Sequence, residues 1–201
     1  MSSSNRDCIN FYFFRHGQTD WNKERRLQGH SNTYLNELGR KQAHELREKL
    51  SAFPIDHMVS SDLSRAFETA QIVNQNWKLK IQIDKRLREA SFGEAEGMII
   101  DDLIAKYGEE SWLALKGFGD SSKAMLPGGE TRQEANSRVE SLIEELATRN
   151  SFNHIAVSTH GGVVANFLKY KAKKNGTLEV PNCVCYLLSF TRGSWDLKGP
   201  L

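Results

Sequence analysis

Long apolar runs are absent from this 201-residue sequence. No uninterrupted apolar stretch approaches the roughly 20 residues that cross a bilayer as a helix. The opening Met-Ser-Ser-Ser-Asn-Arg-Asp is polar and has no apolar core of the kind found in a secretory signal. We therefore expect a cytoplasmic protein that does not contact a membrane.

Cysteines are few, and neither sign of charge is in large excess. The three cysteines are Cys8, Cys183 and Cys185, an odd set without a Cys-x-x-Cys pair, so the sequence predicts neither a disulfide framework nor a zinc site. Lys and Arg number 27 against 25 Asp and Glu, and they form no long basic tract. We expect no nucleic-acid partner, and any recognition of anions should be local.

The length and composition suit a single globular domain over 1–201, because hydrophobic residues make up 39% of the sequence and charged residues 26%. Short apolar segments alternate with stretches of helical periodicity. The predicted strands are 11–14, 55–60, 81–83, 155–158, 183–190 and 195–197, and the predicted helices are 36–53, 61–73, 98–116, 131–146 and 163–171. This alternation predicts an α/β fold, a three-layer α/β/α sandwich with a mostly parallel central sheet.

The segment from about 94 to 130 is expected to be a lid-like insertion. It combines the helical pattern at 98–116 with a Gly- and Ser-rich loop at 117–129. Long irregular segments in compact domains are usually lids or binding loops. Trp112, Phe118, Lys123 and Met125 are candidates to contact a leaving group, although core packing explains an aromatic residue equally well.

Polar side chains end two of the predicted strands in the same way. Phe11–Phe14 is followed by Arg15-His16-Gly17, and Ile155–Ser158 by Thr159-His160-Gly161. Ligands of α/β sheets bind at the carboxyl ends of strands, so both histidines should face one ligand. Arg65, one turn into the helix after a third strand, could reach the same anion. Two arginines and two histidines suit a phosphate dianion, so we expect neither a metal nor another cofactor.

These motifs, with others placed between them, resemble the histidine phosphatase (phosphoglycerate-mutase-like) superfamily over nearly the whole chain. The matching residues are Arg15-His16-Gly17 with Asn22, Leu27-Gln28-Gly29, Ser60-Ser61 with Arg65-Ala66, Glu89 with Phe92-Gly93 and Glu96-Gly97, and Thr159-His160-Gly161-Gly162. The order and spacing are highly specific. The resemblance implies a phosphoglycerate-mutase-like fold.

The resemblance also implies a role for each matching residue. His16 would be the nucleophile that becomes phosphorylated, and Glu89 the proton donor to the leaving group. The phosphate and substrate would be bound by Arg15, Asn22, Gln28, Gly29, Arg65, His160 and Gly161. From the residues alone, blander alternatives stay open: Arg65 as an exposed partner of Glu68, and Glu89 as a surface partner of Arg86 or Arg88.

The sequence departs from cofactor-dependent phosphoglycerate mutases in ways that bear on activity. Ala90-Ser91-Phe92 follows Glu89 where those mutases have Arg-His-Tyr, Ile100 stands at the position of a lysine, and the insertion has no Arg-Arg pair. The second charged end of a phosphoglycerate therefore lacks an evident partner. This favours a phosphomonoester hydrolase acting on a small molecule, with a phosphoglycerate mutase or a non-catalytic phosphate-binding module as alternatives. A homodimer is also left open.

Overall fold

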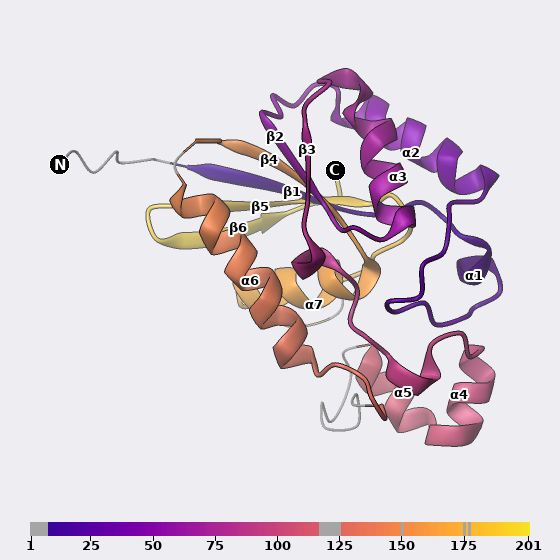
Figure 1. The fold of residues 1–201 in the computed structure, drawn as a ribbon. Coiled ribbons are helices and arrows are strands. Elements are labelled where there is room, and N and C mark those ends of the chain that lie inside the picture. The colour runs from indigo at the N-terminus through magenta and orange to yellow at the C-terminus, as the bar shows by residue number, and fades with distance from the viewer. Residues whose placement is uncertain (1–7, 117–125, 150, 175, 177) are drawn as a thin grey trace.

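A six-stranded sheet forms the centre of the protein in the computed structural model, which describes residues 8–116, 126–149, 151–174, 176 and 178–201 (Figure 1). The strands are β1 (Ile9–Arg15), β2 (His57–Ser60), β3 (Ile81–Ile83), β4 (His154–Thr159), β5 (Cys185–Thr191) and β6 (Ser194–Lys198). Their order is β3-β2-β4-β1-β5-β6. The first four in this order pair in parallel, and β5 and β6 pair antiparallel at one edge. The predicted mostly parallel sheet is confirmed.

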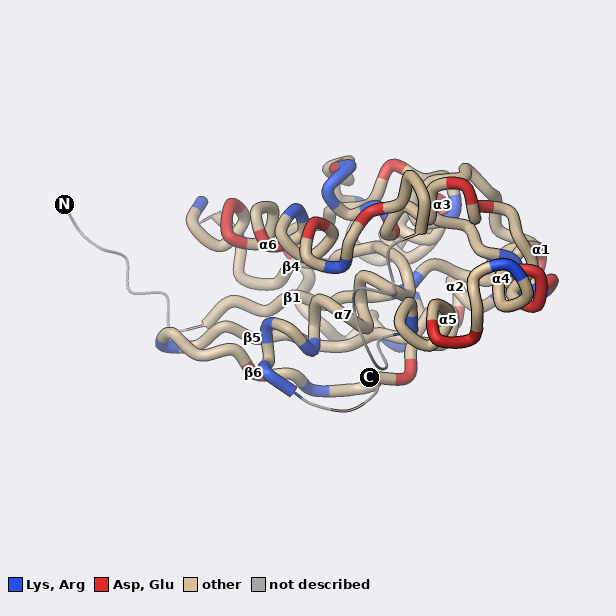
Figure 2. The backbone as a smooth tube through the Cα atoms, turned by 90° about the horizontal axis from the view of Figure 1, so that it is seen from below, with Lys and Arg blue, Asp and Glu red and all other residues tan. Residues whose placement is uncertain are grey.

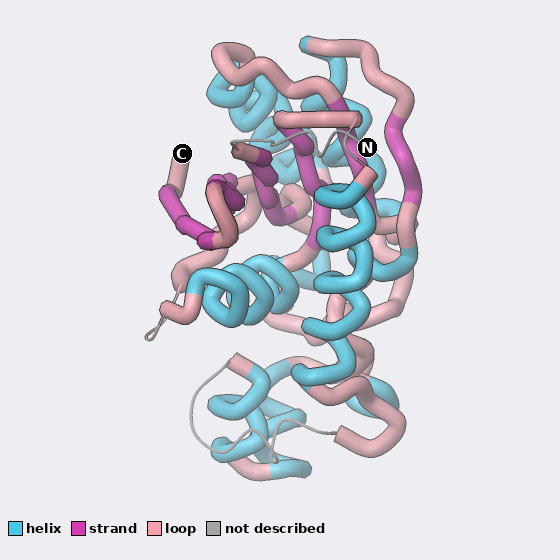
Figure 3. The backbone as a smooth tube through the Cα atoms, turned by 90° about the vertical axis from the view of Figure 1, so that its left-hand side faces the viewer, coloured by secondary structure: helices cyan, strands magenta, loops and turns pink. Residues whose placement is uncertain are grey.

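Helices cover both faces of the sheet because β1 is apolar on both sides. The helices are α1 (Asp20–Lys23), α2 (Glu37–Leu50), α3 (Ser64–Val73), α4 (Ile100–Tyr107), α5 (Glu109–Leu115), α6 (Arg132–Thr148) and α7 (Gly161–Ala172). Successive side chains of a strand point to opposite faces. Phe11 and Phe13 pack in the cluster that contains residues of α6 and α7, whereas Tyr12 and Phe14 pack with residues of α2 and α3. The strands therefore lie between two helical layers, as the sequence predicts (Figure 3).

Two of the long helices begin at the capping residues that the sequence indicates. The side chain of Asn36 accepts a hydrogen bond from the amide of Gly39 at the start of α2. Thr131 and Glu134 form a reciprocal capping box at the start of α6. The predicted helix over 61–73 begins later in the structure, because α3 starts only at Ser64, and Ser61 does not cap it.

The insertion contains two short helices, so the prediction of one helix over 98–116 is wrong. Gly108 separates α4 from α5 with φ +85°, a left-handed conformation that glycine adopts without a steric penalty. The two helices pack around a small cluster that contains Leu103 and Leu126, apart from the main sheet (Figures 1 and 3). The predicted loop lies outside the described residues over 117–125, and so do Phe118, Lys123 and Met125.

Two general properties bear on the class of protein. Within the described ranges, every helix is too short or too polar to cross a bilayer. All three cysteines are free, and burial raises the pKa of Cys183 to about 12. A thiol with that pKa carries almost no thiolate at neutral pH, so Cys183 is a packing residue rather than a nucleophile.

Candidate active site

The carboxyl ends of β1 and β4 lie side by side, and each delivers a histidine. Arg15 is the register partner of Thr159, so His16 and His160 leave neighbouring strands at the same level. Their ring centroids are 5.2 Å apart in an edge-on arrangement. The expectation that the two strand ends bring their histidines to one common site is confirmed.

A cavity of about 380 Å³ opens at this end of the sheet. The predicted site residues that line it are Arg15, His16, Asn22, Gln28, Gly29, Arg65, Glu89 and Gly161. The ninth, His160, does not line the cavity, but its ring contacts that of His16. The structure thus brings together every residue that the sequence singles out for the site.

His16 is held as a neutral imidazole with one nitrogen available for attack. Its Nδ1 lies 2.7 Å from the carbonyl oxygen of Gly17 and must carry the proton, because a carbonyl can only accept. The lone pair is therefore on Nε2, where the Nε of Arg65 donates to it at 3.3 Å. Burial, with the positive charges of Arg65 and Arg15, lowers the pKa of His16 well below its usual value. The nucleophilic form prevails at neutral pH.

Arg65 is fully buried and Arg15 is partly buried, and both are fixed by main-chain carbonyls. Arg65 donates to Ser31 O and Gly29 O, both at 2.8 Å, and Arg15 donates to Val180 O at 2.7 Å. The alternative that pairs Arg65 with Glu68 is wrong, because Arg65 is fully buried and Glu68 pairs with another arginine. Burial lowers the pKa of Arg65 to about 10, which leaves it charged at neutral pH. Each guanidinium keeps N–H groups that these carbonyls do not use.

His160 is fully buried, and only one of its two ring nitrogens has a hydrogen-bond partner among the described residues. Its Nε2 lies 2.9 Å from the hydroxyl of Ser61, which also accepts from the amide of Leu63. Its Nδ1 has no partner among the residues that the structure describes. In the tautomer in which the Ser61 hydroxyl donates to Nε2, the imidazole proton is on Nδ1 as an unpaired buried donor. A phosphate oxygen would satisfy it. Ser61 is therefore a support for His160 rather than a helix cap.

Two amide side chains add further donors to the cavity. The carboxamide oxygen of Asn22 accepts from the backbone of Thr19, and that of Gln28 accepts from Thr33. With the oxygens engaged inside the protein, the two NH₂ groups remain to face a ligand. Asn182 was missed by the sequence reasoning: its Nδ2 donates to His16 O at 3.0 Å and reaches the Asn22 oxygen at 3.3 Å.

Glu89 stands at the edge of the cavity with its carboxylate oriented by main-chain amides. Its Oε2 accepts from the amide of Gly162 at 2.8 Å, and its Oε1 accepts from its neighbour Ala90 at 3.0 Å. The alternative that pairs Glu89 with Arg86 or Arg88 is wrong, because those arginines pair with other carboxylates. Glycine at 162 leaves room for this carboxylate, since a Cβ there would lie 2.5 Å from Glu89 Oε1 and would displace it.

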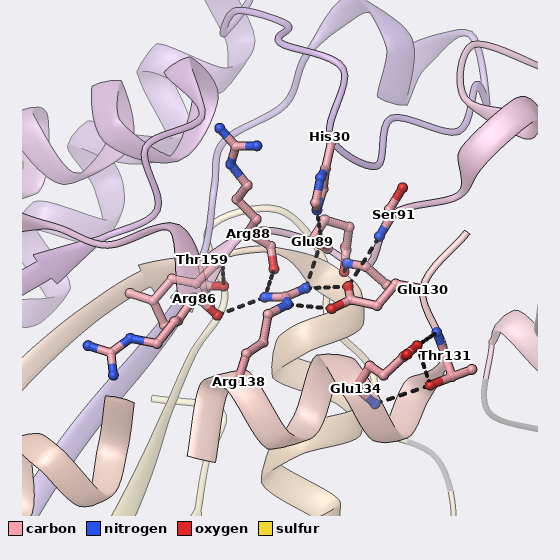
Figure 4. A network of polar contacts seen from close by, with 12 residues as sticks. His30, Arg86, Arg88, Glu89, Ser91, Glu130, Thr131, Glu134, Arg138 and Thr159 are labelled. Carbon is pink, nitrogen blue, oxygen red and sulfur yellow. Dashed lines mark hydrogen bonds and ion pairs between the residues drawn. The ribbon is translucent and has the colours of Figure 1, made fainter. Parts of the chain in front are cut away.

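Side chains from two other segments hold the backbone of Glu89. His30 lies with Nε2 2.9 Å from Glu89 O, so it supports the backbone rather than facing the ligand. Arg138 of α6, which the sequence reasoning also missed, donates to the same oxygen at 2.9 Å (Figure 4). No motif marks such residues, because their acceptors are carbonyls, which every residue type carries.

The half of the cavity that the predicted site residues do not form is largely apolar. It is lined by Trp21, Leu27, Phe92, Ile100, Trp112, Leu115, Leu178 and Val180, with Arg25, Arg26 and Lys116 among them. Two of these cations already have partners: Arg25 lies 3.5 Å from Asp101, and Arg26 donates to Gly97 O at 2.6 Å. The leaving group of a ligand would therefore meet mainly aromatic and aliphatic surface.

Metal-binding chemistry has no evident place among the described residues. No group of three or more His, Cys, Asp or Glu side chains there is arranged to hold an ion. The arrangement instead offers a neutral imidazole, two guanidinium groups, three further N–H donors and one carboxyl group around one cavity. These groups can bind a phosphoryl group, attack it and exchange a proton with its leaving oxygen.

Comparisons with known proteins agree with this chemistry. The sequence model of the histidine phosphatase superfamily (branch 1) matches residues 11–200. The chain is 36% identical over 167 residues to phosphoglycerate mutase-like protein 4 of Arabidopsis thaliana, covering 82% of this chain and 71% of that protein. It is 32% identical over 195 residues to the probable phosphoglycerate mutase GpmB of Salmonella choleraesuis (strain SC-B67), covering 95% and 89%. A solved mycobacterial glucosyl-3-phosphoglycerate phosphatase superposes with a TM-score of 0.83 at 28% identity, covering 94% and 97%.

Proposed function

The chain belongs to the histidine phosphatase superfamily, and from that premise we propose that it is a phosphomonoester hydrolase acting through a phosphohistidine at His16. The observation that carries this proposal is the state of His16: Nδ1 is fixed on Gly17 O, and the lone pair of Nε2 points to the donors of Arg65. A buried imidazole in this form is ready to attack phosphorus. The substrate is a small phosphorylated metabolite, and no metal takes part.

The reaction has two displacements at phosphorus. In the first, a bond forms between His16 Nε2 and phosphorus as the ester P–O bond breaks, and the carboxyl proton of Glu89 passes to the leaving alkoxide. In the second, water attacks phosphorus, the N–P bond breaks, and Glu89 takes a proton from the water. Arg15, Arg65 and His160 would stabilise the charge on the phosphoryl oxygens in both steps.

We propose hydrolysis rather than the mutase reaction, in which the phosphoryl group returns to the substrate, because of the apolar half of the cavity. A mutase must hold its substrate's second charged end while the phosphoryl group rests on histidine. Here Ile100 and Trp112 line that half, Arg25 and Arg26 already have partners, and Lys116 lies over the ring of Trp112. An alcohol held mainly by apolar contacts leaves, and water replaces it. The mutase names of some relatives keep phosphoglycerate mutase as the second candidate.

The test follows the phosphoryl group itself, as phosphoprotein, as inorganic phosphate and as label transferred to a second molecule. Brief mixing with a labelled phosphomonoester, followed by denaturation at alkaline pH, should trap an acid-labile phosphoprotein that disappears in His16→Ala. A panel of phosphomonoesters should release inorganic phosphate in EDTA as fast as with added magnesium. Transfer of label from one phosphoglycerate to another at a rate above phosphate release would instead establish the mutase. A requirement for magnesium would overturn the metal-free mechanism.

The role of Glu89 has its own test. Glu89→Gln keeps the shape of the side chain and loses the proton. Formation of phosphoenzyme from an alkyl phosphate should slow by about 10²- to 10⁴-fold, the usual range for general acid catalysis. Formation from p-nitrophenyl phosphate, whose leaving group departs without a proton, should slow far less. Equal slowing in single-turnover experiments would reject the assignment.

A further inference from the structure

One guanidinium, that of Arg138, forms hydrogen bonds to several main-chain carbonyl groups around Glu89. Arg138 Nη1 donates to the carbonyl oxygens of Arg86 at 2.7 Å and Arg88 at 2.6 Å, while Nη2 donates to Glu89 O at 2.9 Å. His30 reaches the same Glu89 oxygen from the opposite segment. Figure 4 shows the Arg138 guanidinium in the middle of these acceptors. Three carbonyls within four residues are thus fixed by a single side chain.

Glu130 completes the arrangement from the end of the insertion. Its two carboxylate oxygens accept from Nε and Nη2 of Arg138, each at 2.7 Å, in the bidentate geometry that gives strong, directional pairs. Both side chains are less than 20% exposed, at 19% and 17%. The amide of Glu130 also donates to Ser91 O at 2.9 Å. The Arg138–Glu130 pair therefore connects α6, the base of the insertion and the Glu89 segment.

The Glu89 segment needs such support because it has no regular structure. Residues 88–92 belong to neither a helix nor a strand, so no ladder of main-chain hydrogen bonds fixes them. A carboxyl group that protonates a leaving oxygen must be held close to its acceptor, and misplacement by about 1 Å can cost about 10²-fold in rate. The amide of Gly162 orients the end of the side chain. The main-chain carbonyl of Glu89 is held by Arg138 and His30.

We infer that Arg138, aligned by Glu130, is the positioning residue for Glu89 in proton transfer. This inference rests on the proposed function, in which Glu89 is the proton donor. Arginine suits the task because its planar fork serves several acceptors at once, whereas a lysine ammonium is a point charge on a flexible stem. Glu130 also balances the positive charge of the guanidinium.

The test uses the leaving group as its readout. Arg138→Met should slow single-turnover phosphoenzyme formation from an alkyl phosphate by about 10- to 100-fold, because misplacement of the general acid costs part of the roughly 10²- to 10⁴-fold that it contributes. With p-nitrophenyl phosphate, the slowing should stay within a few-fold. Arg138→Lys and Glu130→Gln, which disturb the fold less, should show the same preference in a milder form, with lysine recovering part of the rate. Equal slowing of both substrates would overturn the inference.

Arg86→Met is the matched control. It removes an arginine from the same segment that also contacts α6, through Glu145, but that makes no side-chain contact with the backbone of Glu89. Its rates with both substrates should remain within about twofold of the parent, as is usual for sites outside the reaction path. A leaving-group preference in Arg86→Met equal to that in Arg138→Met would show a general loosening of α6 and overturn the inference.

A double variant separates positioning from direct action. In a Glu89→Gln background there is no proton to place, so adding Arg138→Met should slow the alkyl substrate little further, which is the non-additivity expected of residues that act as a unit. Additive slowing would overturn the inference while leaving the role of Glu89 intact. If Glu89→Gln alone shows no leaving-group preference, the general-acid assignment fails first, so the two failures are distinguishable.

Discussion

The two halves of the cavity are built from different parts of the fold. The phosphate half stands on the ends of β1 and β4, where Arg65 and His160 are fully buried and main-chain groups fix most of the side chains. The leaving-group half combines residues of α4 and α5, which pack around a small cluster beside the main sheet, with residues of α1 and of the loop that follows it. The first is part of the core, whereas the second is attached to it.

This difference separates chemistry from specificity. The phosphate half is built on the ends of central strands, so it suits a step common to every substrate. The insertion can change with little effect on the sheet, as is usual for functional segments carried on a rigid scaffold. The first turns of α4 and α5 are acidic (Asp101, Asp102, Glu109 and Glu110; red in Figure 2), in contrast to the arginines of the phosphate half. Substitutions in the two halves should therefore have effects on activity that differ in size and in their dependence on the substrate.

The largest effect should come from His16→Ala. Loss of the nucleophile removes the covalent path, so kcat should fall by about 10⁵-fold or more with every substrate. The melting temperature should stay close to that of the parent, because the side chain follows the strand and is not part of the apolar clusters. Phosphate release and a thermal melt measure the two quantities. Residual activity within tenfold of the parent would mean that water attacks directly.

Gly162→Ala should have a large effect confined to poor leaving groups. The new Cβ would stand 2.5 Å from Glu89 Oε1, and the carboxylate, as the end of a flexible side chain, would move. Alkyl phosphates should react about 10- to 100-fold more slowly, because proton transfer depends on placement. p-Nitrophenyl phosphate should react almost normally. Loss of activity toward both, with an unchanged melting temperature, would show that Gly162 serves the phosphate half instead.

Stability should depend on pH through the two buried histidines. Burial, with the arginine charges, lowers the pKa of both His16 and His160 well below the value of about 6.5 that each has when unfolded. The unfolded chain therefore binds more protons below pH 6.5. This contribution to stability is fully present above pH 6.5 and is lost as the pH falls toward the folded values.

Each histidine should contribute about 1 kcal/mol to the difference in unfolding free energy between pH 7.0 and pH 5.5. Urea unfolding in phosphate-free buffer at the two pH values measures that difference. The His16→Ala variant should lose its share of it, whereas an Ala substitution at His44, on the surface helix α2, should retain the parent's dependence. An equal pH dependence in all three proteins would contradict the desolvated character of the phosphate half.

The phosphate half could be predicted from the sequence because each strand and its catalytic side chain are adjacent in the chain. Arg15-His16-Gly17 and Thr159-His160-Gly161 directly follow apolar runs, so naming the strands also places the residues. Arg138 and Asn182 could not be found in this way. They lie far along the chain from Glu89 and His16 and act on carbonyl oxygens, which carry no signature in sequence.

The insertion could be predicted only in outline. Its apolar residues recur at helical spacing on both sides of Gly108, so the pattern predicts one helix, and only the left-handed φ of that glycine divides it into α4 and α5. The same periodicity cannot say which aromatic faces a ligand. In the structure Trp112 does both: it packs against the cluster that contains Leu103 and lines the cavity.

Trp112→Ala should have the smallest effect and the strongest dependence on the size of the leaving group. Phenol and 2-naphthol are similar in acidity, so their phosphates differ mainly in the apolar surface offered to the insertion. The variant should lose about 5- to 10-fold in kcat/KM for 2-naphthyl phosphate, a loss of the size expected for part of an apolar contact. It should lose less than about twofold for phenyl phosphate. Leu113→Ala, an exposed neighbour on α5 that does not line the cavity, is the control and should change neither value. An equal loss for both esters would mean that the insertion supports the phosphate half as well, and the separation between the two regions would not hold.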